Sequence, residues 1–158
     1  MKKIIYTLLL LASYNSYSQD FSAYVNPMIG TGGVGHTYPG ATVPYGMVQV
    51  SPDTRNESSW EGCGGYWYND SLIYGFSHTH LSGTGCSDYG DVLLMPGTDK
   101  ISFDPIVYGS PFNHATEKSS PGYYSVLLND SRIKCEMTAS TRVGVQKYTY
   151  PAIFSPSE

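Results

Sequence analysis

The chain has 158 residues, which is enough for one domain with its own hydrophobic core. Only 14% of the residues are charged, and the formal net charge is −4. Nucleic acids and anionic membranes are bound through Lys and Arg side chains that neutralise phosphate groups. An acidic chain is poorly suited to that role, so we expect no nucleic-acid partner.

The first eighteen residues have the pattern of an export signal. Lys2 and Lys3 precede an apolar run at residues 4–12, and the small residues Ser16 and Ser18 stand at the positions that a signal peptidase reads. The run is too short to cross a bilayer, although an uncleaved membrane anchor is the alternative. We predict a mature chain that begins near Gln19, has no membrane span and is secreted or periplasmic. Without the two lysines, seven basic residues remain against thirteen acidic ones, a net charge of −6.

Tyrosine and glycine are frequent, with 15 and 17 copies. This composition suits an exported β-rich protein with long ordered loops. It also suits sugar binding, because aromatic faces pack against the C–H surfaces of a sugar ring. Equally, the tyrosines can simply fill the pleated surfaces of sheets. Composition alone leaves these two interpretations open.

Strand patterns dominate the chain, whereas no stretch after the export signal keeps a helical apolar period without a Gly or Pro. The apolar run MVQV at 47–50 is closed by Ser51-Pro52, and DVLLM at 91–95 is closed by Pro96-Gly97. A third run, YYSVLL at 123–128, ends at a turn pair. We predict a strand at each of these three places.

The clearest strand is predicted at 132–140, where apolar and polar residues alternate. Ile133, Cys135 and Met137 share one face, and charged residues occupy the other, as in a half-exposed antiparallel strand. Residues 141–150 follow as its partner. Short strands separated by turns indicate an all-β fold, an antiparallel β-sandwich with long Gly/His/Tyr-rich loops.

The stretch IGTGGVGHTYPG contains the G-x-G-x-x-G spacing of a dinucleotide-binding fingerprint at residues 30–35, with Asp53 at the place of a ribose-binding acid. That site needs a strand before the glycines and a helix after them. Pro39 and Pro44 forbid the helix, and Pro27 interrupts the strand. We therefore reject nucleotide binding. The glycines instead allow a close approach of the backbone to a ligand, with His36 among them.

A second cluster lies in GFSHTHLSGTGCSDYGD, at residues 75–91. On an extended chain His78 and His80 would face the same side, and with Asp88 or Asp91 they could bind a transition metal. Histidines with this spacing more often donate hydrogen bonds to backbone and carboxylates. The two aspartates could act as general acid and base, but we favour a role in capping the Gly-rich turns.

A third cluster is WEGCGGYWY at residues 60–68. Trp60 beside the carboxylate of Glu61 is what a sugar subsite would use, and a core tryptophan next to a tight turn is the alternative. The cysteines Cys63, Cys86 and Cys135 are odd in number and show no C-x-x-C spacing, which excludes a zinc ribbon. Their pairing cannot be deduced from the sequence.

Four stretches, in this order, resemble a known family. They are VNPMIGTGGVGHTYPGATVPYGMVQVSPDTR, GYWYNDSLIYGFSHTHLSGTGCSDYGDVLLMPG, FNHATEKSSPGYYSVLL and TASTRVGVQKYTYP. From about Tyr24 to Pro151 the chain resembles the N-terminal domain of glycoside hydrolase family 92. The resemblance implies a calcium-dependent, inverting, exo-acting α-mannosidase that acts on mannose-containing glycans. It implies a β-sandwich at 19–158 after a signal peptide at 1–18, and a following (α/α)6 barrel that carries the catalytic carboxyls and most of the calcium site.

The resemblance also implies roles for the three clusters. Trp60 matches a tryptophan that contacts the sugar on the leaving-group side, and we expect no catalytic residue in these 158 positions. The expected substrate-binding residues are Trp60, Glu61, Gly32, Gly33 and His36, and the residues expected to brace the cleft are His78, His80, Asp88 and Asp91.

Two other functions compete with this one. A stand-alone carbohydrate-binding or structural module would expose Trp60 and Trp67 as a stacking platform. An exported metal-binding protein would use His36, His78 and His80. Under the leading interpretation, residues 1–158 alone are inactive.

Overall fold

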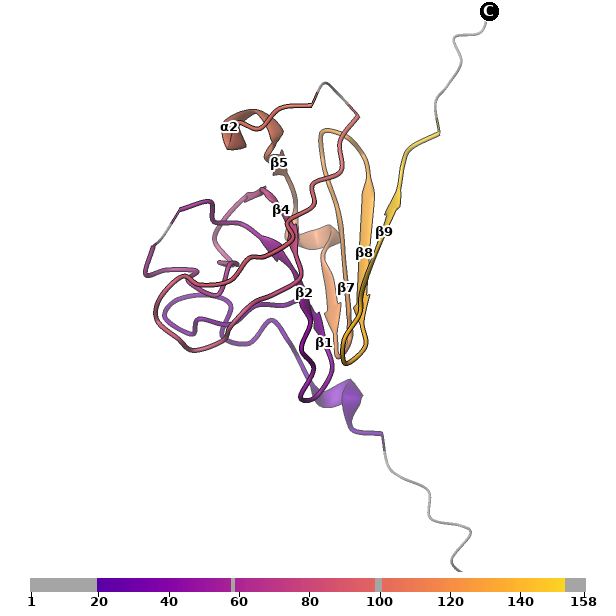
Figure 1. Cartoon of the computed structure of the whole chain (residues 1–158). Helices are drawn as coiled ribbons and strands as arrows, with labels where there is room; N and C mark the ends of the chain where they lie inside the picture. The colour runs from indigo at the N-terminus through magenta and orange to yellow at the C-terminus, as the bar shows by residue number, and fades with distance from the viewer. Residues whose placement is uncertain (1–19, 58, 99–100, 153–158) are drawn as a thin grey trace, which may run out of the picture.

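The structure, a computed structural model, describes residues 20–57, 59–98 and 101–152 (Figure 1). The predicted signal peptide lies outside these residues. Among the residues described, no helix has both the length and the apolar character needed to cross a membrane. The elements that are present are almost all strands, joined in antiparallel sheets.

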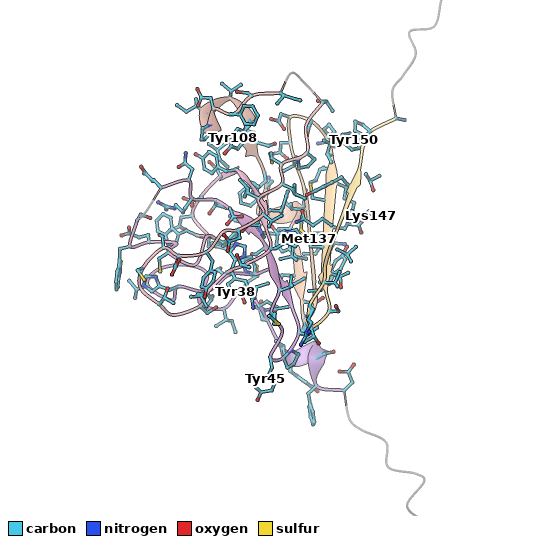
Figure 2. All side chains as sticks on the ribbon, viewed as in Figure 1. Tyr38, Tyr45, Tyr108, Met137, Lys147 and Tyr150 are labelled. Carbon is cyan, nitrogen blue, oxygen red and sulfur yellow. The ribbon has the colours of Figure 1, made fainter. Side chains whose placement is uncertain are left out.

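The C-terminal half forms a four-stranded antiparallel sheet in which each strand pairs with the next along the chain. In β8, Cys135 lies opposite Val126 on one side and Tyr148 on the other. The alternation predicted at 132–140 is confirmed, because Ile133, Cys135 and Met137 are buried while Lys134 is exposed. Figure 2 places Met137 toward the interior. The strands are β6 Lys118–Ser120, β7 Tyr123–Leu127, β8 Lys134–Ala139 and β9 Gly144–Thr149.

A second, smaller sheet packs against β7, β8 and β9, so that the two sheets form a sandwich. Its order is β1-β2-β4 and both pairings are antiparallel. Residues from both sheets meet in one hydrophobic core. The strands are β1 Ala41–Thr42, β2 Gln49–Asp53 and β4 Gly75–Ser77. The core cluster comprises Ala41, Val50, Tyr66, Ile73, Phe76, Phe112, Tyr124, Val126, Leu128, Ile133, Cys135 and Met137. The predicted all-β sandwich is thereby confirmed.

The strand predicted at 47–50 begins later and continues further than expected. Strand β2 runs through Pro52 to Asp53, so Ser51-Pro52 does not close it. The N–H of Gln49 donates to His78 on the β4 side, and alternation turns the nitrogen of Pro52 toward the β1 side. There β1 pairs only as far as Val50, so the missing donor of proline removes no ladder hydrogen bond.

The strand predicted at 91–95 is wrong. Only Leu94 forms an isolated bridge, to Phe76 of β4. Val92 has a φ of 56°, which an extended strand cannot contain and a β-branched residue rarely adopts. The Leu93 side chain packs directly over Gly75, where an added Cβ would lie 2.7 Å from it. The apolar run therefore covers β4 as a loop instead of extending the sheet.

The remaining elements are short. Strands β3 Leu72–Ile73 and β5 Ser110–Pro111 form a separate pair. The helical turns are η2 Ser22–Tyr24, α2 Pro105–Tyr108 and η3 His114–Thr116. Helix α2 begins with Pro105 after the cap residue Asp104, whose side chain accepts from the backbone N–H of Ile106.

One carboxylate is buried between the layers. Glu117, whose side chain is 3% exposed, accepts hydrogen bonds from the hydroxyls of Tyr66 at 3.0 Å and Tyr124 at 2.5 Å. His114 Nδ1 lies 2.7 Å from the same carboxylate. Burial, with the nearby Glu117, raises the pKa of both phenols. The network satisfies the polar atoms that these large residues bring into the core.

Candidate functional site

The sequence segments richest in Gly, His and Asp fold together as loops beside the β1-β2-β4 sheet. We call residues 29–38, 54–57, 59–70 and 79–92 the loop cluster. Backbone hydrogen bonds join its parts: Gly83 N–H donates to His36 O at 2.8 Å, and Tyr68 N–H donates to Thr31 O at 2.9 Å. In Figure 1 these loops extend to the side of the small sheet that faces away from β8 and β9.

Two glycines show what the loop cluster requires of this residue type. Gly65 has a φ of +93°, and an added Cβ there would lie 2.7 Å from the His80 ring and 2.8 Å from Asp53 Oδ1. Gly33 has a φ of +57° but no atom within 4 Å of an added Cβ. The first glycine allows a close approach to a polar centre, whereas the second meets only a backbone requirement. A Cβ added at Gly32 would lie 3.5 Å from the Cβ of Tyr68, an ordinary contact distance.

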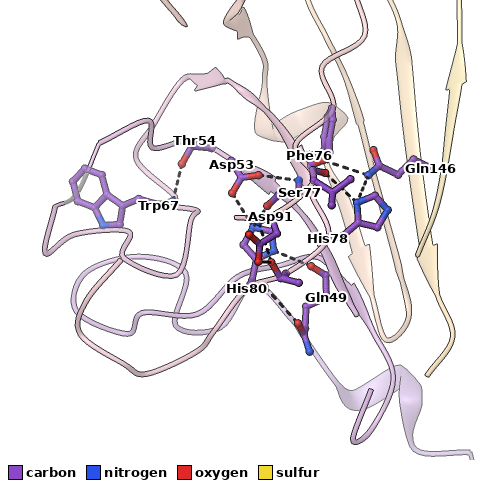
Figure 3. Close-up of polar contacts among 12 residues, drawn as sticks. Gln49, Asp53, Thr54, Trp67, Phe76, Ser77, His78, His80, Asp91 and Gln146 are labelled. Carbon is purple, nitrogen blue, oxygen red and sulfur yellow. Dashed lines mark hydrogen bonds and ion pairs between the residues drawn. The ribbon is translucent and has the colours of Figure 1, made fainter. Parts of the chain in front are cut away.

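The polar centre of the cluster is a buried ion pair between Asp53 and His80 (Figure 3). His80 Nε2 lies 2.9 Å from Asp53 Oδ1, and its Nδ1 lies 2.8 Å from the carbonyl oxygen of Gln49. Both ring nitrogens of His80 therefore face oxygen atoms, and Nε2 also lies 3.1 Å from the hydroxyl of Ser77. Asp53 Oδ2 also accepts the N–H of Ser77 at 2.9 Å. The pair locks the end of β2 to the end of β4.

The prediction that His78 and His80 face the same side is wrong. Strand β4 ends at Ser77, so both histidines lie in a bend where strand alternation no longer applies. His78 Nδ1 lies 3.1 Å from Val92 O and 3.3 Å from Gln146 Nε2 on β9, while His80 turns toward β2 (Figure 3).

The described part of the chain contains no cluster of side chains that could bind a metal ion. No group of three or more His, Cys, Asp or Glu residues there could hold a metal ion. Calcium prefers six to eight oxygen ligands, and these residues do not provide a cluster of that kind. The described residues therefore do not fit a calcium ion.

The two aspartates of the second motif make loop contacts. Asp91 Oδ2 accepts the hydroxyl of Thr79 at 3.1 Å, and the Asp91 N–H donates back to that hydroxyl at 3.0 Å. The carbonyl of Asp91 accepts the N–H of His78 at 3.0 Å. Asp88 is exposed, and its Oδ1 accepts the N–H of Tyr89 at 2.8 Å. These hydrogen bonds tie the loop from Thr79 to Asp91 into a closed unit.

A cleft of about 490 Å³ opens between the loop cluster and α2. Its lining combines charged and polar groups with the rings of Tyr74, Tyr89 and Tyr108. Such a mixture suits a neutral polyhydroxylated ligand, because rings pack against C–H groups while polar groups bond to hydroxyls. Arg55 is fixed at the rim by Asp70 at 2.7 Å and lies 4.6 Å above the ring of Trp67. The lining also includes Asp53, Glu57, Gly62, Cys63, Gly65, His80 and Asp88.

Next to this cleft, Trp60 and His36 are in contact. Trp60 is 57% exposed, and its ring lies 4.7 Å from the His36 ring at an interplanar angle of 76°. The Cys63 Sγ atom, which also lines the cleft, lies 2.7 Å from His36 Nδ1. Glu61 is exposed beside Trp60. The structure thus brings Trp60 and His36 together, while Glu61 and Gly33 lie exposed in their loops.

Several residues of the site were not among the candidates taken from the sequence. Arg55, Tyr74 and Tyr108 line the cleft but lie outside the three candidate clusters. Tyr108 comes from α2, far along the chain, and no local pattern could have placed it here. Asp53 entered the sequence analysis only through the rejected nucleotide fingerprint; in the structure it lies beside Gly65, which is not part of that fingerprint.

All three cysteines lie in the described part of the chain, and none is in a disulfide. Cys63 and Cys135 are buried, and Cys86 is exposed. Burial raises the pKa of the Cys135 thiol to about 12. The sequence left the disulfide pairing open, and in the structure all three cysteines are free thiols.

Comparison with known proteins gives a consistent result. Residues 24–157 match the family model described as the glycosyl hydrolase family 92 N-terminal domain. A family GH92 α-mannosidase of Bacteroides thetaiotaomicron is 44% identical, with a TM-score of 0.80, over 84% of this chain and 19% of that one. That enzyme has also been solved in complex with mannoimidazole.

Two further relatives agree. A family GH92 inverting mannosidase of Bacteroides thetaiotaomicron is 30% identical, with a TM-score of 0.67, over 86% of this chain and 19% of that one. A protein of Arthroderma benhamiae named as a secreted glycosidase is 31% identical over 142 residues, which are 85% of this chain and 18% of that protein. The chain thus spans about a fifth of the length of the relatives it matches.

Proposed function

The chain belongs to the N-terminal domain family of glycosyl hydrolase family 92, and from this premise we propose that it forms part of a secreted α-mannosidase. In this proposal the whole enzyme removes terminal α-mannose residues from glycans with inversion at the anomeric carbon. Two similar solved structures are described as mannosidases, one of them inverting, and a third relative is named as secreted. The N-terminal export pattern supports secretion or a periplasmic location.

The observation that carries the proposal is an exposed tryptophan fixed beside a polar, tyrosine-lined cleft. Trp60 is 57% exposed although its ring is in contact with His36. An exposed, immobilised indole offers a flat apolar surface at little entropic cost, which is what stacking on a sugar ring requires. We assign Trp60 to the leaving-group side of the scissile bond, with Glu61 and the backbone of Gly32 and Gly33 shaping the same wall.

We propose no catalytic role for a residue of this chain. An inverting glycosidase needs a general acid and a general base about 6.5–9.5 Å apart, with water between base and sugar. The buried carboxylate of the site, Asp53, is already engaged by His80, and Glu117 in the core is engaged by phenols. His78, His80, Asp88 and Asp91 hold the loops in place. Both catalytic carboxyls would come from an (α/α)6 barrel in the longer protein, and residues 1–158 alone would be inactive.

Calcium belongs to this proposal only for the longer protein. Among the described residues of this chain, no group of three or more His, Cys, Asp or Glu could hold the ion. A chelator should therefore abolish activity of the full-length enzyme without changing the fold of the loop cluster.

A stand-alone carbohydrate-binding module is the second candidate, and the exposure of Trp60 favours it. Such a module would expose Trp60 and Trp67 together as a stacking platform. This platform is incomplete, because Trp67 is partly buried beneath Arg55. The two candidates separate by size. Intact mass of the protein from its source cells, detected with an antibody to this segment, should give a species far larger than 17.3 kDa. A species near the mass of the processed chain alone would contradict the enzyme proposal.

The decisive assay uses the full-length protein and an α-linked mannose disaccharide. Inversion predicts β-mannose as the first product, which proton NMR distinguishes from the α-anomer before mutarotation. Trp60→Ala should raise KM up to about tenfold, the equivalent of about 1.4 kcal/mol of lost stacking. Tyr45→Ala, a change at a fully exposed residue outside the loop cluster, is the matched control and should change nothing. Release of α-mannose, or a Trp60→Ala enzyme with unchanged KM, would overturn the respective part of the proposal.

A further inference from the structure

The backbone of His36 adopts a conformation that is unfavourable for a residue with a side chain. Its φ is 53°, in the left-handed region that a residue with a Cβ seldom adopts. Its carbonyl accepts the N–H of Gly83 at 2.8 Å, and its side chain is buried, with 9% of the residue exposed. Strain of this kind persists only where the surrounding structure fixes a residue, and it often marks a functional position.

The two nitrogens of the His36 ring have different surroundings. Nδ1 lies 2.7 Å from the Sγ atom of Cys63. Nε2 is buried and has no hydrogen-bond partner among the described residues. If the thiol donates to Nδ1, the neutral ring must carry its proton on Nε2. If the proton has instead moved from sulfur to Nδ1, Nε2 is protonated as well. Nε2 presents an N–H donor in both of these states, whereas a ring that donates from Nδ1 to the sulfur would leave Nε2 unprotonated.

The His36 ring is also in contact with the indole of Trp60. The rings of His36 and Trp60 are 4.7 Å apart and inclined at 76°, an edge-to-face geometry. An N–H group aimed at the electron-rich face of an indole makes a weak hydrogen bond. We propose that Cys63, His36 and Trp60 form a relay in which the Cys63 thiol fixes the proton of His36 on Nε2, and this N–H orients the indole of Trp60.

The indole of Trp60 has a second close neighbour, Gly85. A Cβ added at Gly85 would lie 3.0 Å from Cζ3 and 3.2 Å from Cη2 of Trp60. The six-membered ring therefore rests against a backbone position that must remain glycine, which also has a φ of +68°. Trp60 is thus positioned by His36 and by Gly85, and more than half of its surface stays free. The role of the relay rests on the proposed function. In that role the relay holds the indole so that it can pack against the apolar face of a pyranoside ring. Cys63 and His36 are positioning residues.

The first test is spectroscopic and does not depend on any sugar. Full-length protein is labelled with ¹⁵N-histidine, and His36→Gln assigns the His36 signals. The relay predicts a protonated, slowly exchanging Nε2 whose proton is shifted upfield by the indole ring current. Trp60→Leu should remove the upfield shift but leave Nε2 protonated. Cys63→Ala should remove the tautomer preference, and Cys63→Ser, which keeps a donor, should restore it.

A buried cysteine elsewhere provides the matched control. Cys135 on β8 is as buried as Cys63 but lies in the sheet, so Cys135→Ser should leave the His36 signals unchanged. The wild-type spectrum is itself decisive if Cys63→Ala fails to fold. A proton on Nδ1 with Nε2 unprotonated, or an Nε2 proton without an upfield shift, would overturn the relay.

The second test measures what the relay does for binding. Cys63→Ala should raise KM for the mannose disaccharide about threefold to tenfold with kcat within twofold, and Cys63→Ser should recover most of the loss. A fall in kcat at constant KM would contradict a positioning role. If the spectral signature is present but no mannoside is turned over, the proposed function fails while the relay stands. If mannoside turnover depends on Trp60 but the signature is absent, the relay fails alone.

Discussion

The sheet β6–β9 and the loop cluster reach ordered structure in different ways. The sheet is specified by alternation: Ile133, Cys135 and Met137 enter the core and their neighbours face outward. The loop cluster has few apolar residues inside and is held by an ion pair, by side chains that bond to backbone and by close glycine contacts. Damage to an apolar core spreads through the whole sandwich, whereas damage to a loop contact should remain local.

The largest effect is expected in the sheet. Met137→Ala removes a fully buried side chain between the two layers and should cost about 2–5 kcal/mol of the free energy of unfolding. Urea denaturation should show the midpoint falling for every structural probe together. Arg142→Ala, at an exposed residue in the turn after β8, is the control and should stay within about 0.5 kcal/mol of the wild type. A loss confined to the loop cluster would contradict the idea that the sheets form the cooperative unit.

A smaller and more local effect is expected from Gly65→Ala. The new Cβ would lie 2.7 Å from the His80 ring, at a φ of +93°, so the loop must move away from the Asp53–His80 pair. We expect a loss of about 2 kcal/mol and faster hydrogen exchange in the loop cluster, with sheet amides unchanged. Gly33→Ala matches the positive φ without the clash and should cost about 1 kcal/mol. Equal losses for the two variants would show that contact with the ion pair is unimportant.

The buried phenols of the core predict a loss of stability in alkali. The folded pKa values of Tyr66 and Tyr124 lie above the ordinary value of 10.0 because burial and Glu117 oppose ionisation. Their contribution is fully present below pH 10 and is lost as the pH rises above it, at up to about 1.4 kcal/mol per pH unit for each phenol. Urea denaturation between pH 9 and 11 measures the slope. Tyr66→Phe should reduce it, and Tyr45→Phe, at a fully exposed position, should not.

The smallest effect is expected on the outer face of the same sheet. Hydrogen bonds from Lys134 and then Tyr123 lower the pKa of Glu136 from 4.5 to about 2. The stability that Glu136 contributes is therefore present above pH 4.5 and lost as the pH falls toward 2. Glu136→Gln should flatten the acid side of the stability curve, and Lys134→Met should flatten it in part. A curve unchanged by both substitutions would show that this surface network contributes nothing measurable.

The strand predictions from sequence succeeded where the burial of each side chain depends only on its alternation along a regular sheet. The strands at 123–128 and 132–140 are present within one or two residues, because alternation alone decides which side chains are buried. The same reasoning failed at 91–95, where Val92 adopts a positive φ, and at 47–50, where the end of β1 made Pro52 acceptable inside β2. In both cases the outcome depended on a neighbouring segment that the local pattern does not contain.

The sequence by itself determined the all-β class, the alternation of β8 and the family, since long motifs recur in fixed order. Only the tertiary structure decided how those motifs meet. It turned His78 toward β9 and His80 toward Asp53, and it placed Cys63 against His36 beside Trp60. The physical reason is range: alternation acts between adjacent residues, whereas a loop site is formed by hydrogen bonds and close contacts between segments far apart in the chain.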